Sequence, residues 1–289
     1  MTLLSLIQLL LIGIAIAGIV LGVAWYKNRS FSFHRLVLLT TFFTFDLILF
    51  GAFTRLTDSG LGCPDWPGCY GLSNPIAAIN HIQEAEQLMP TGPVTLSKAW
   101  IEMLHRYFAM GVGCLIIGMV FWSYRLRSSM GSMYLRASIA ILGLVCVQGA
   151  FGAWTVTQKL QPIIVTTHLL LGLSLLSALT IFSNVTSLTA EVKFESRIRN
   201  QFRLWLVIGL VILIAQIFLG AWVSTNYAVL ACDDFPTCQG GYWPAMDLTK
   251  GFHLWRDLGH DHVGELLTMD ALRAIHWVHR LGAVVTLIV

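Results

Sequence analysis

Residues Phe50 to Gly71 read FGAFTRLTDSGLGCPDWPGCYG, and residues Leu219 to Gly240 read LGAWVSTNYAVLACDDFPTCQG. Near its end each stretch has two cysteines with five residues between them. Counted from the first cysteine as position one, the third residue is an aspartate and the fifth is a proline. We call the segments Cys63–Cys69 and Cys232–Cys238 the first and second clasp. Similar segments so far apart in one chain indicate an internal repeat.

A second pair of matching motifs follows the clasps. The clasps are offset by 169 residues, from Cys63 to Cys232, whereas EMLHR at Glu102 and HWVHR at His276 are offset by 174. The second loop therefore carries a five-residue insertion. The repeating unit is span, clasped loop, span, span, span. The second copy has two of its four spans, so we expect it to continue beyond Val289.

The composition places the chain in a membrane. Of its 289 residues, 56% are hydrophobic and 11% are charged, and the mean hydropathy is +0.72. This balance excludes an ordinary soluble domain. Apolar runs long enough for membrane spans recur, the last one being short for a full crossing. They lie at 3–26, 36–54, 99–123, 137–158, 162–183, 204–224 and 274–289.

Positive charge predicts the topology of these spans. Ten of the 18 Lys and Arg residues cluster in alternate connections, which marks those connections as cytoplasmic: Lys27, Arg29, Arg35, Arg125, Arg127, Arg136, Lys193, Arg197, Arg199 and Arg203. The loops 55–98 and 225–273, with 4 and 7 acidic residues, then lie outside, as does the N-terminus. The net charge of +3 is mostly this topology signal, and we expect no nucleic-acid partner.

Both clasps fall in the outside loops. An oxidising compartment allows such cysteine pairs to form disulfides. Closing so short a ring stabilises a loop by about 2–3 kcal/mol. The pairs Cys63 with Cys69 and Cys232 with Cys238 are therefore structural staples or, for at least one of them, a redox-active pair.

Histidines recur at matched positions within the spans. His105 and His168 each lie about six residues into a span, entering from the outside, at a depth of roughly 9 Å. Two such histidines on parallel helices suit a planar metal macrocycle with two axial imidazoles. His279 has the same depth in the second unit. His276, one turn earlier, is a ligand, a contact to a propionate or a packing residue.

Charged residues accompany these histidines. Glu102 lies one turn before His105, on the same helix face, and one turn before Arg106. It is either half of a Glu–Arg pair at the membrane edge or a carboxylate beside a bound macrocycle. The second unit has His276 in place of Glu102 and Arg280 in place of Arg106. This asymmetry indicates that the first unit performs chemistry and the second holds a helper group.

Together these segments resemble haem A synthase, the membrane enzyme family that converts haem O to haem A. The resemblance covers residue 36 to the end and rests on GAFTRLTDSGLGCPDWPGC, EMLHR, TTHLLLGL around His168, and HWVHR. It implies an all-α polytopic membrane protein with two pseudo-symmetric four-helix bundles, the second incomplete. The expected domains are an extra transmembrane helix in 1–35, a haem-substrate bundle in 36–185 and a partial haem b bundle in 204–289.

The resemblance also implies roles for single residues. His105 and His168 would be the axial ligands of the substrate haem O, and His279 would be one axial ligand of a haem b cofactor. Glu102 matches the essential acid of the family. Cys63 and Cys69 match a loop disulfide found in one branch of it. Apart from the resemblance, the positions of His276, Arg106 and Arg280 beside these histidines make them candidates for contacts outside the iron coordination.

The implied reaction oxidises a porphyrin methyl group to a formyl group with oxygen from water, for use in terminal oxidases. The implied location is the bacterial inner membrane, with the clasps on the periplasmic side. We expect membrane lipid, the haem O synthase and an electron acceptor not identifiable from the sequence as partners, and a homo-oligomer stays open. The alternatives are a quinone-linked thiol-disulfide oxidase, which needs no matched histidines, and a b-type cytochrome subunit, which needs no Glu102.

Overall fold

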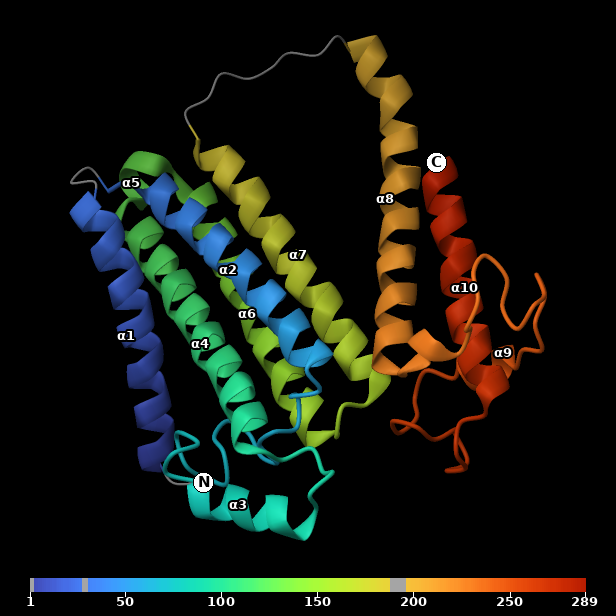
Figure 1. Cartoon of the computed structure of the whole chain (residues 1–289). Coiled ribbons are helices and arrows are strands. Elements are labelled where there is room, and N and C mark those ends of the chain that lie inside the picture. Colours follow the sequence, from blue (N-terminus) through green and yellow to red (C-terminus); the bar gives the residue numbers. More distant parts are fainter. Residues whose placement is uncertain (1–2, 28–30, 188–195) are drawn as a thin grey trace. The chain divides into compact units, whose positions relative to one another are not determined.

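The computed structural model describes residues 3–27, 31–187 and 196–289 (Figure 1). These residues are helical, with no strand among them and three isolated bridges in loops. The helices are α1 Leu3–Lys27, α2 Phe33–Leu56, α3 Ile79–Leu88, α4 Leu96–Arg125, α5 Arg127–Met130, α6 Ser132–Thr157, α7 Pro162–Thr186, α8 Ser196–Thr225, α9 Leu248–Gly251 and α10 Met269–Ile288, with a 3-10 turn η1 at Ala228–Leu230.

Six of the helices in the described ranges are long and apolar enough to cross a membrane: α1, α2, α4, α6, α7 and α8. The chain is therefore a multi-pass membrane protein, and the all-α prediction is confirmed. The seventh predicted span, 274–289, is helical as part of α10, which has 20 residues and does not reach the apolar threshold of the others. Asp270 and Arg273 lie in its first two turns, and Arg280 lies in its middle.

The chain divides into two compact units. The first comprises Met1–Gln158 and Leu171–Leu188, and the second comprises Lys159–Leu170 and Thr189–Val289. The division passes through α7, whose first turns belong to the second unit. The domain boundaries expected from the repeat stay a prediction.

Helix α4 forms the centre of the first unit. Its residues Val112, Leu115, Ile116 and Met119 are buried in one cluster that also receives side chains from α1, α2, α6 and α7. Burying an aliphatic side chain of this size stabilises a fold by about 1.5–3 kcal/mol in water. In a bilayer the same interdigitation acts through close packing. The helix that bears Glu102 and His105 is thus the most firmly held one of its unit.

Helix α1, which lies outside the repeat, packs along α4 through small residues. Gly13 lies so close to α4 that a β-carbon there would be 2.9 Å from Cβ of Met110. One turn further along α1, Ile16 lies against Gly111 of α4, where a β-carbon would be 2.8 Å from its Cγ2. Small residues at a crossing allow two membrane helices to approach closely. The N-terminal span is therefore an integral layer of the first unit.

The second unit is built on the pair α8 and α10. Trp222 of α8 is fully buried, stacks on Phe218, and donates a hydrogen bond from Nε1 to the Gly251 carbonyl at 3.0 Å. In the loop between the helices, Lys250 pairs with the buried Asp261 at 2.8 Å. The hydrogen bond from Lys250 holds the pKa of Asp261 at about 2. The Trp222 hydrogen bond thus fastens the long loop to α8, and the ion pair closes the loop on itself at ordinary pH.

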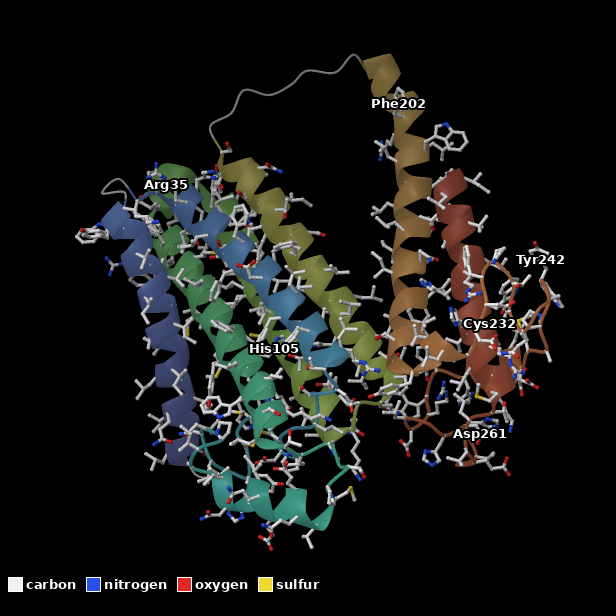
Figure 2. All side chains as sticks on the ribbon, viewed as in Figure 1. Arg35, His105, Phe202, Cys232, Tyr242 and Asp261 are labelled. Carbon is white, nitrogen blue, oxygen red and sulfur yellow. A yellow bond between two sulfur atoms is a disulfide. The ribbon has the colours of Figure 1, made fainter. Side chains whose placement is uncertain are left out.

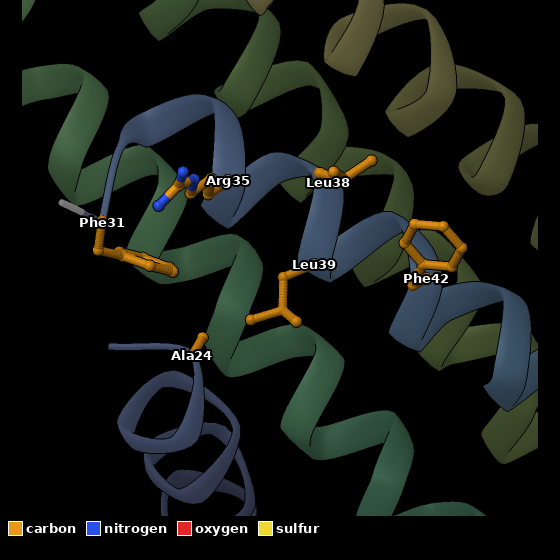
Figure 3. Close-up of a pocket in the computed structure, with 6 residues that line it drawn as sticks. All are labelled: Ala24, Phe31, Arg35, Leu38, Leu39 and Phe42. Atoms are coloured by element: carbon orange, nitrogen blue, oxygen red, sulfur yellow. The ribbon is translucent and has the colours of Figure 1, made fainter. Parts of the chain in front are cut away.

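A surface pocket in the first unit lies away from the predicted site. It has a volume of about 170 Å³ and is lined by Ala24, Phe31, Arg35, Leu38, Leu39 and Phe42 (Figure 3). Pockets that enclose drug-sized molecules begin at roughly 300 Å³. With Phe42 and Leu38 exposed on a membrane helix, this hollow suits a lipid chain better than a porphyrin.

The α1–α4 contact predicts an unequal effect of two identical substitutions. Gly13→Val forces a branched side chain against Met110 and should destabilise the protein by about 1–3 kcal/mol. Gly18→Val, on the same helix with open space around it, is the matched control. Thermal unfolding in detergent should show a lower Tm for Gly13→Val than for Gly18→Val. Equal Tm values would contradict the close packing of α1 on α4.

Candidate functional site

Both clasps are disulfide-closed and have the same internal geometry. The Cα atoms of Cys63 and Cys69 are 4.9 Å apart, and those of Cys232 and Cys238 are 4.8 Å apart. All four side chains are buried. The first clasp lies in one apolar cluster with Ile82 of α3. The predicted pairing is confirmed, and the repeat is a repeat in three dimensions.

The aspartate at the third position of each clasp holds the backbone turn that follows the second cysteine. Asp65 accepts hydrogen bonds from the backbone N–H groups of Tyr70 and Gly71, both at 2.6 Å. In the second clasp Asp234 does the same for the N–H groups of Gln239 and Gly240, at 2.7 and 3.0 Å. The Thr237 hydroxyl, followed by these amides, holds the pKa of Asp234 below its usual value. Each clasp therefore has a fixed loop shape.

An arginine of the following membrane helix ties each clasp down. Arg106 of α4 donates from Nη1 to the carbonyls of Asp65 and Gly68, at 2.8 and 2.5 Å. Arg280 of α10 donates from Nη1 to the carbonyls of Asp234 and Thr237, at 2.8 and 2.7 Å. The two arginines occupy the last position of EMLHR and HWVHR, so the motif and the clasp form one structural device.

The residue four positions before each arginine also contacts that arginine, but its chemical type differs between the two units. Glu102 is buried, pairs with the Arg106 guanidinium and accepts a hydrogen bond from the Cys63 N–H at 2.7 Å. In the second unit His276 Nε2 accepts from Arg280 Nε at 3.1 Å. The Glu–Arg pair predicted from the sequence is thus present. Only the first unit places a carboxylate there.

The histidine before each arginine faces a glycine of the preceding membrane helix. A β-carbon on Gly51 of α2 would lie 3.0 Å from Cε1 of His105, and one on Gly220 of α8 would lie 3.1 Å from Cε1 of His279. The ring of His105, which is labelled in Figure 2, also lies 6.0 Å from the ring of Phe50, centroid to centroid. Each glycine leaves room for an imidazole edge, so the two histidines have matching places in their units.

The residues predicted to bind haem come from both units. His105 belongs to the first unit, whereas His168 lies in the part of α7 that belongs to the second. Their expected pairing across one bundle stays a prediction. Gln216, by contrast, contacts His279 directly, at 3.0 Å from its amide nitrogen to Nδ1. No motif in the sequence marks Gln216 as functional; the signal that could have found it is its apolar repeat counterpart, Leu47.

These features define a class of multi-pass membrane protein in which a disulfide-closed loop is tied to a histidine-bearing helix, once in each of two repeated units. The family model described as "Cytochrome oxidase assembly protein", COX15-CtaA, matches residues 34–289. The chain belongs to this family.

Curated relatives carry the name Heme A synthase. The chain is 39% identical over 251 residues to that of Shewanella oneidensis, covering 87% of this chain and 74% of the relative. It is 26% identical over 238 residues to that of Halalkalibacterium halodurans, covering 81% and 72%. It is 27% identical over 261 residues to that of Erythrobacter litoralis, covering 84% and 73%. No solved structure matches the chain significantly.

The two arginines predict a selective effect on the clasps. Arg106→Ala removes hydrogen bonds from a charged donor, each worth about 1.5–3 kcal/mol, and leaves Glu102 buried without its partner. Reduction of Cys63–Cys69 by a mild thiol should become about tenfold faster or more. Differential alkylation and peptide mass spectrometry measure this rate for each pair.

Arg280→Ala provides the internal control, because it should expose Cys232–Cys238 and leave the first clasp protected. If either variant exposed both pairs equally, or neither pair, the arginines would not be the anchors of their clasps.

Proposed function

We propose that this protein is a haem A synthase, an oxidoreductase that converts a methyl group of haem O to a formyl group. Family membership and the name shared by its curated relatives support this activity. The structural observation that carries the proposal is the glycine facing an imidazole in each unit, Gly51 with His105 and Gly220 with His279. Each glycine lets the histidine pack closely against the facing helix, and cofactor sites of helix bundles are built from side chains on facing helices.

In this proposal the bundle expected from the first sequence repeat, residues 36–185, binds the substrate. His105 is one axial ligand of the haem O iron and His168 is the other, which fixes the ring and blocks oxygen chemistry at the iron. The methyl carbon then reacts at the ring edge. Conversion of –CH₃ and one water to –CHO releases four protons and four electrons, so the site needs a proton acceptor and an external electron acceptor.

Glu102 is the proposed catalytic residue. Its carboxylate is buried, one turn from His105, and balanced by Arg106 and by the Cys63 N–H. A buried carboxylate with one fixed cation keeps its negative charge aimed at one place. It can take a proton from the reacting group or stabilise positive charge that develops on the methyl carbon. The same contacts make the first clasp the lid of this site.

The second unit holds a haem b in this proposal, with His279 as one axial ligand. Such a haem would supply a one-electron relay between the substrate site and the acceptor. His276 and Arg280 fix the outer end of α10 against the second clasp, through contacts at 3.1, 2.8 and 2.7 Å. Their role is therefore to hold the helix that presents His279.

The alternative activities fit the observations less well. A thiol-disulfide oxidase requires a sulfur that an attacking thiolate can reach. The clasp cysteines are instead buried, with Cys63, Cys69 and Cys238 having no exposed surface. A b-type cytochrome subunit would need no buried carboxylate beside its histidine. The structural-staple interpretation of the clasps is the one supported by their burial.

The proposed location is the bacterial inner membrane, with both clasps on the periplasmic side. In the first unit the basic ends of α1 and α4, Lys27 and Arg125, are then cytoplasmic. Haem O reaches the first unit from the haem O synthase. Electrons leave toward an acceptor in or at the membrane.

The substrate site predicts a strict requirement for its two histidines. His105→Ala and His168→Ala should each abolish haem A formation, because each removes an axial ligand of the substrate iron. His81→Ala is the control, since His81 stacks on Tyr70 in the outside loop. The measurement is haem A extracted from membranes at equal protein level. Near-normal haem A in either ligand variant would refute the substrate site.

Glu102→Gln separates catalysis from clasp anchoring. The amide can still accept from the Cys63 N–H, but it carries no charge. We expect haem binding to persist and oxidation to fall by about 10²–10⁴-fold, the usual contribution of a general base. Glu86→Gln, an exposed acid on α3, is the control. If Glu102→Gln lost its haem while the Cys63–Cys69 disulfide stayed protected, Glu102 would be a haem-binding residue and not the catalytic acid–base.

A further inference from the structure

Gln216 of α8 contacts both the imidazole ring and the backbone carbonyl of His279. Its amide nitrogen is 3.0 Å from Nδ1 of the imidazole and 3.2 Å from the His279 carbonyl oxygen. The amide oxygen is buried and has no hydrogen-bond partner among the described residues. One end of this side chain is therefore engaged with His279, and the other carries an unused acceptor.

The room for this side chain is made by a second glycine. A β-carbon on Gly282 would lie 2.3 Å from Oε1 of Gln216, so no larger residue fits at position 282 while the glutamine is in place. Gly282 follows His279 by three residues on the same helix. Gly220 accommodates the ring and Gly282 accommodates the amide that contacts it.

The His105 position lacks both parts of this arrangement. By the repeat offsets of 169 and 174, Gln216 corresponds to Leu47 and Gly282 corresponds to Phe108. Phe108 packs edge-on against Phe43 and Phe50. The fold of the unit therefore does not require a glutamine and a glycine at these places. Gln216 and Gly282 are therefore specific to the surroundings of His279 and absent from those of His105.

Iron ligation through one imidazole nitrogen requires the proton to sit on the other. The amide of Gln216 covers Nδ1, so Nε2 is the nitrogen that can ligate. When Nε2 ligates, Nδ1 carries the proton and needs an acceptor. A half-turn of the amide about its last bond brings Oε1 to that nitrogen, where it can accept the proton, in exchange for the hydrogen bond to the His279 carbonyl.

We propose that Gln216 is the positioning residue for His279: its amide oxygen accepts the Nδ1 proton and so presents Nε2 to the haem iron. This inference rests on the proposed haem b site in the second unit. Outer hydrogen-bond partners of ligating histidines typically contribute 10- to 100-fold to metal affinity and raise the basicity of the ligand. Gln216 thus makes the second unit a site that retains its haem, whereas the first must exchange substrate for product.

The test uses the full-length protein purified with its haem. Gln216→Leu removes the acceptor and should lower the affinity for haem b by about 10- to 100-fold. Gln216→Glu supplies a permanent carboxylate acceptor. It should keep the haem but shift its midpoint potential to a more negative value, because a more basic imidazole favours ferric iron. Haem content and redox titration measure these effects, and Gln8→Leu, exposed on α1, is the control.

If Gln216 only supported the fold, Gln216→Glu would leave the midpoint potential of haem b unchanged. If Gln216→Leu kept its haem b, or if Gln216→Glu kept an unchanged potential, the assignment of Gln216 would be overturned while the haem b site itself stood. An unaltered protein that carries no haem b would overturn both. The protected state of Cys232–Cys238 in each variant reports that the second unit is still folded.

Discussion

The rest of the site depends on one repeated interaction, an arginine side chain that donates to two carbonyls of a disulfide-closed loop. Arg106 and Arg280 each fasten a clasp to the helix that carries the preceding histidine. A charged donor shared between two backbone carbonyls is a strong and directional tie. It sets the height of the loop over the membrane helix. In the first unit it also fixes Glu102.

Duplication and divergence account for the two units. The shared parts are clasp, arginine, histidine and facing glycine, and in the proposed function they build the scaffold that would bind a haem in each half. The differing parts surround the histidines: Glu102 where the second unit has His276, and Leu47 where it has Gln216. In the proposed function the charge of Glu102 would serve oxidation of the substrate, whereas the amide of Gln216 would serve retention of a cofactor.

Much of this could be predicted from the sequence. Apolar runs gave the spans, and the repeat gave the clasps and the matched histidines, because both are local or periodic signals. The amphipathic helix α3 and the packing of α1 on α4 were not foreseen, since α3 is short and the glycine contact at Gly13 has no pattern of its own. The contact of Gln216 with His279 joins residues 63 positions apart, and only the fold brings such residues together.

The most direct test of the account is the pigment content of the purified full-length protein. Two units, one that exchanges substrate for product and one that retains a cofactor, predict that acid extraction yields haem O and haem A together with protohaem. Chromatography with mass detection resolves the three. Protohaem alone, in a protein from cells that make haem O, would contradict the synthase and leave an electron-transfer cytochrome.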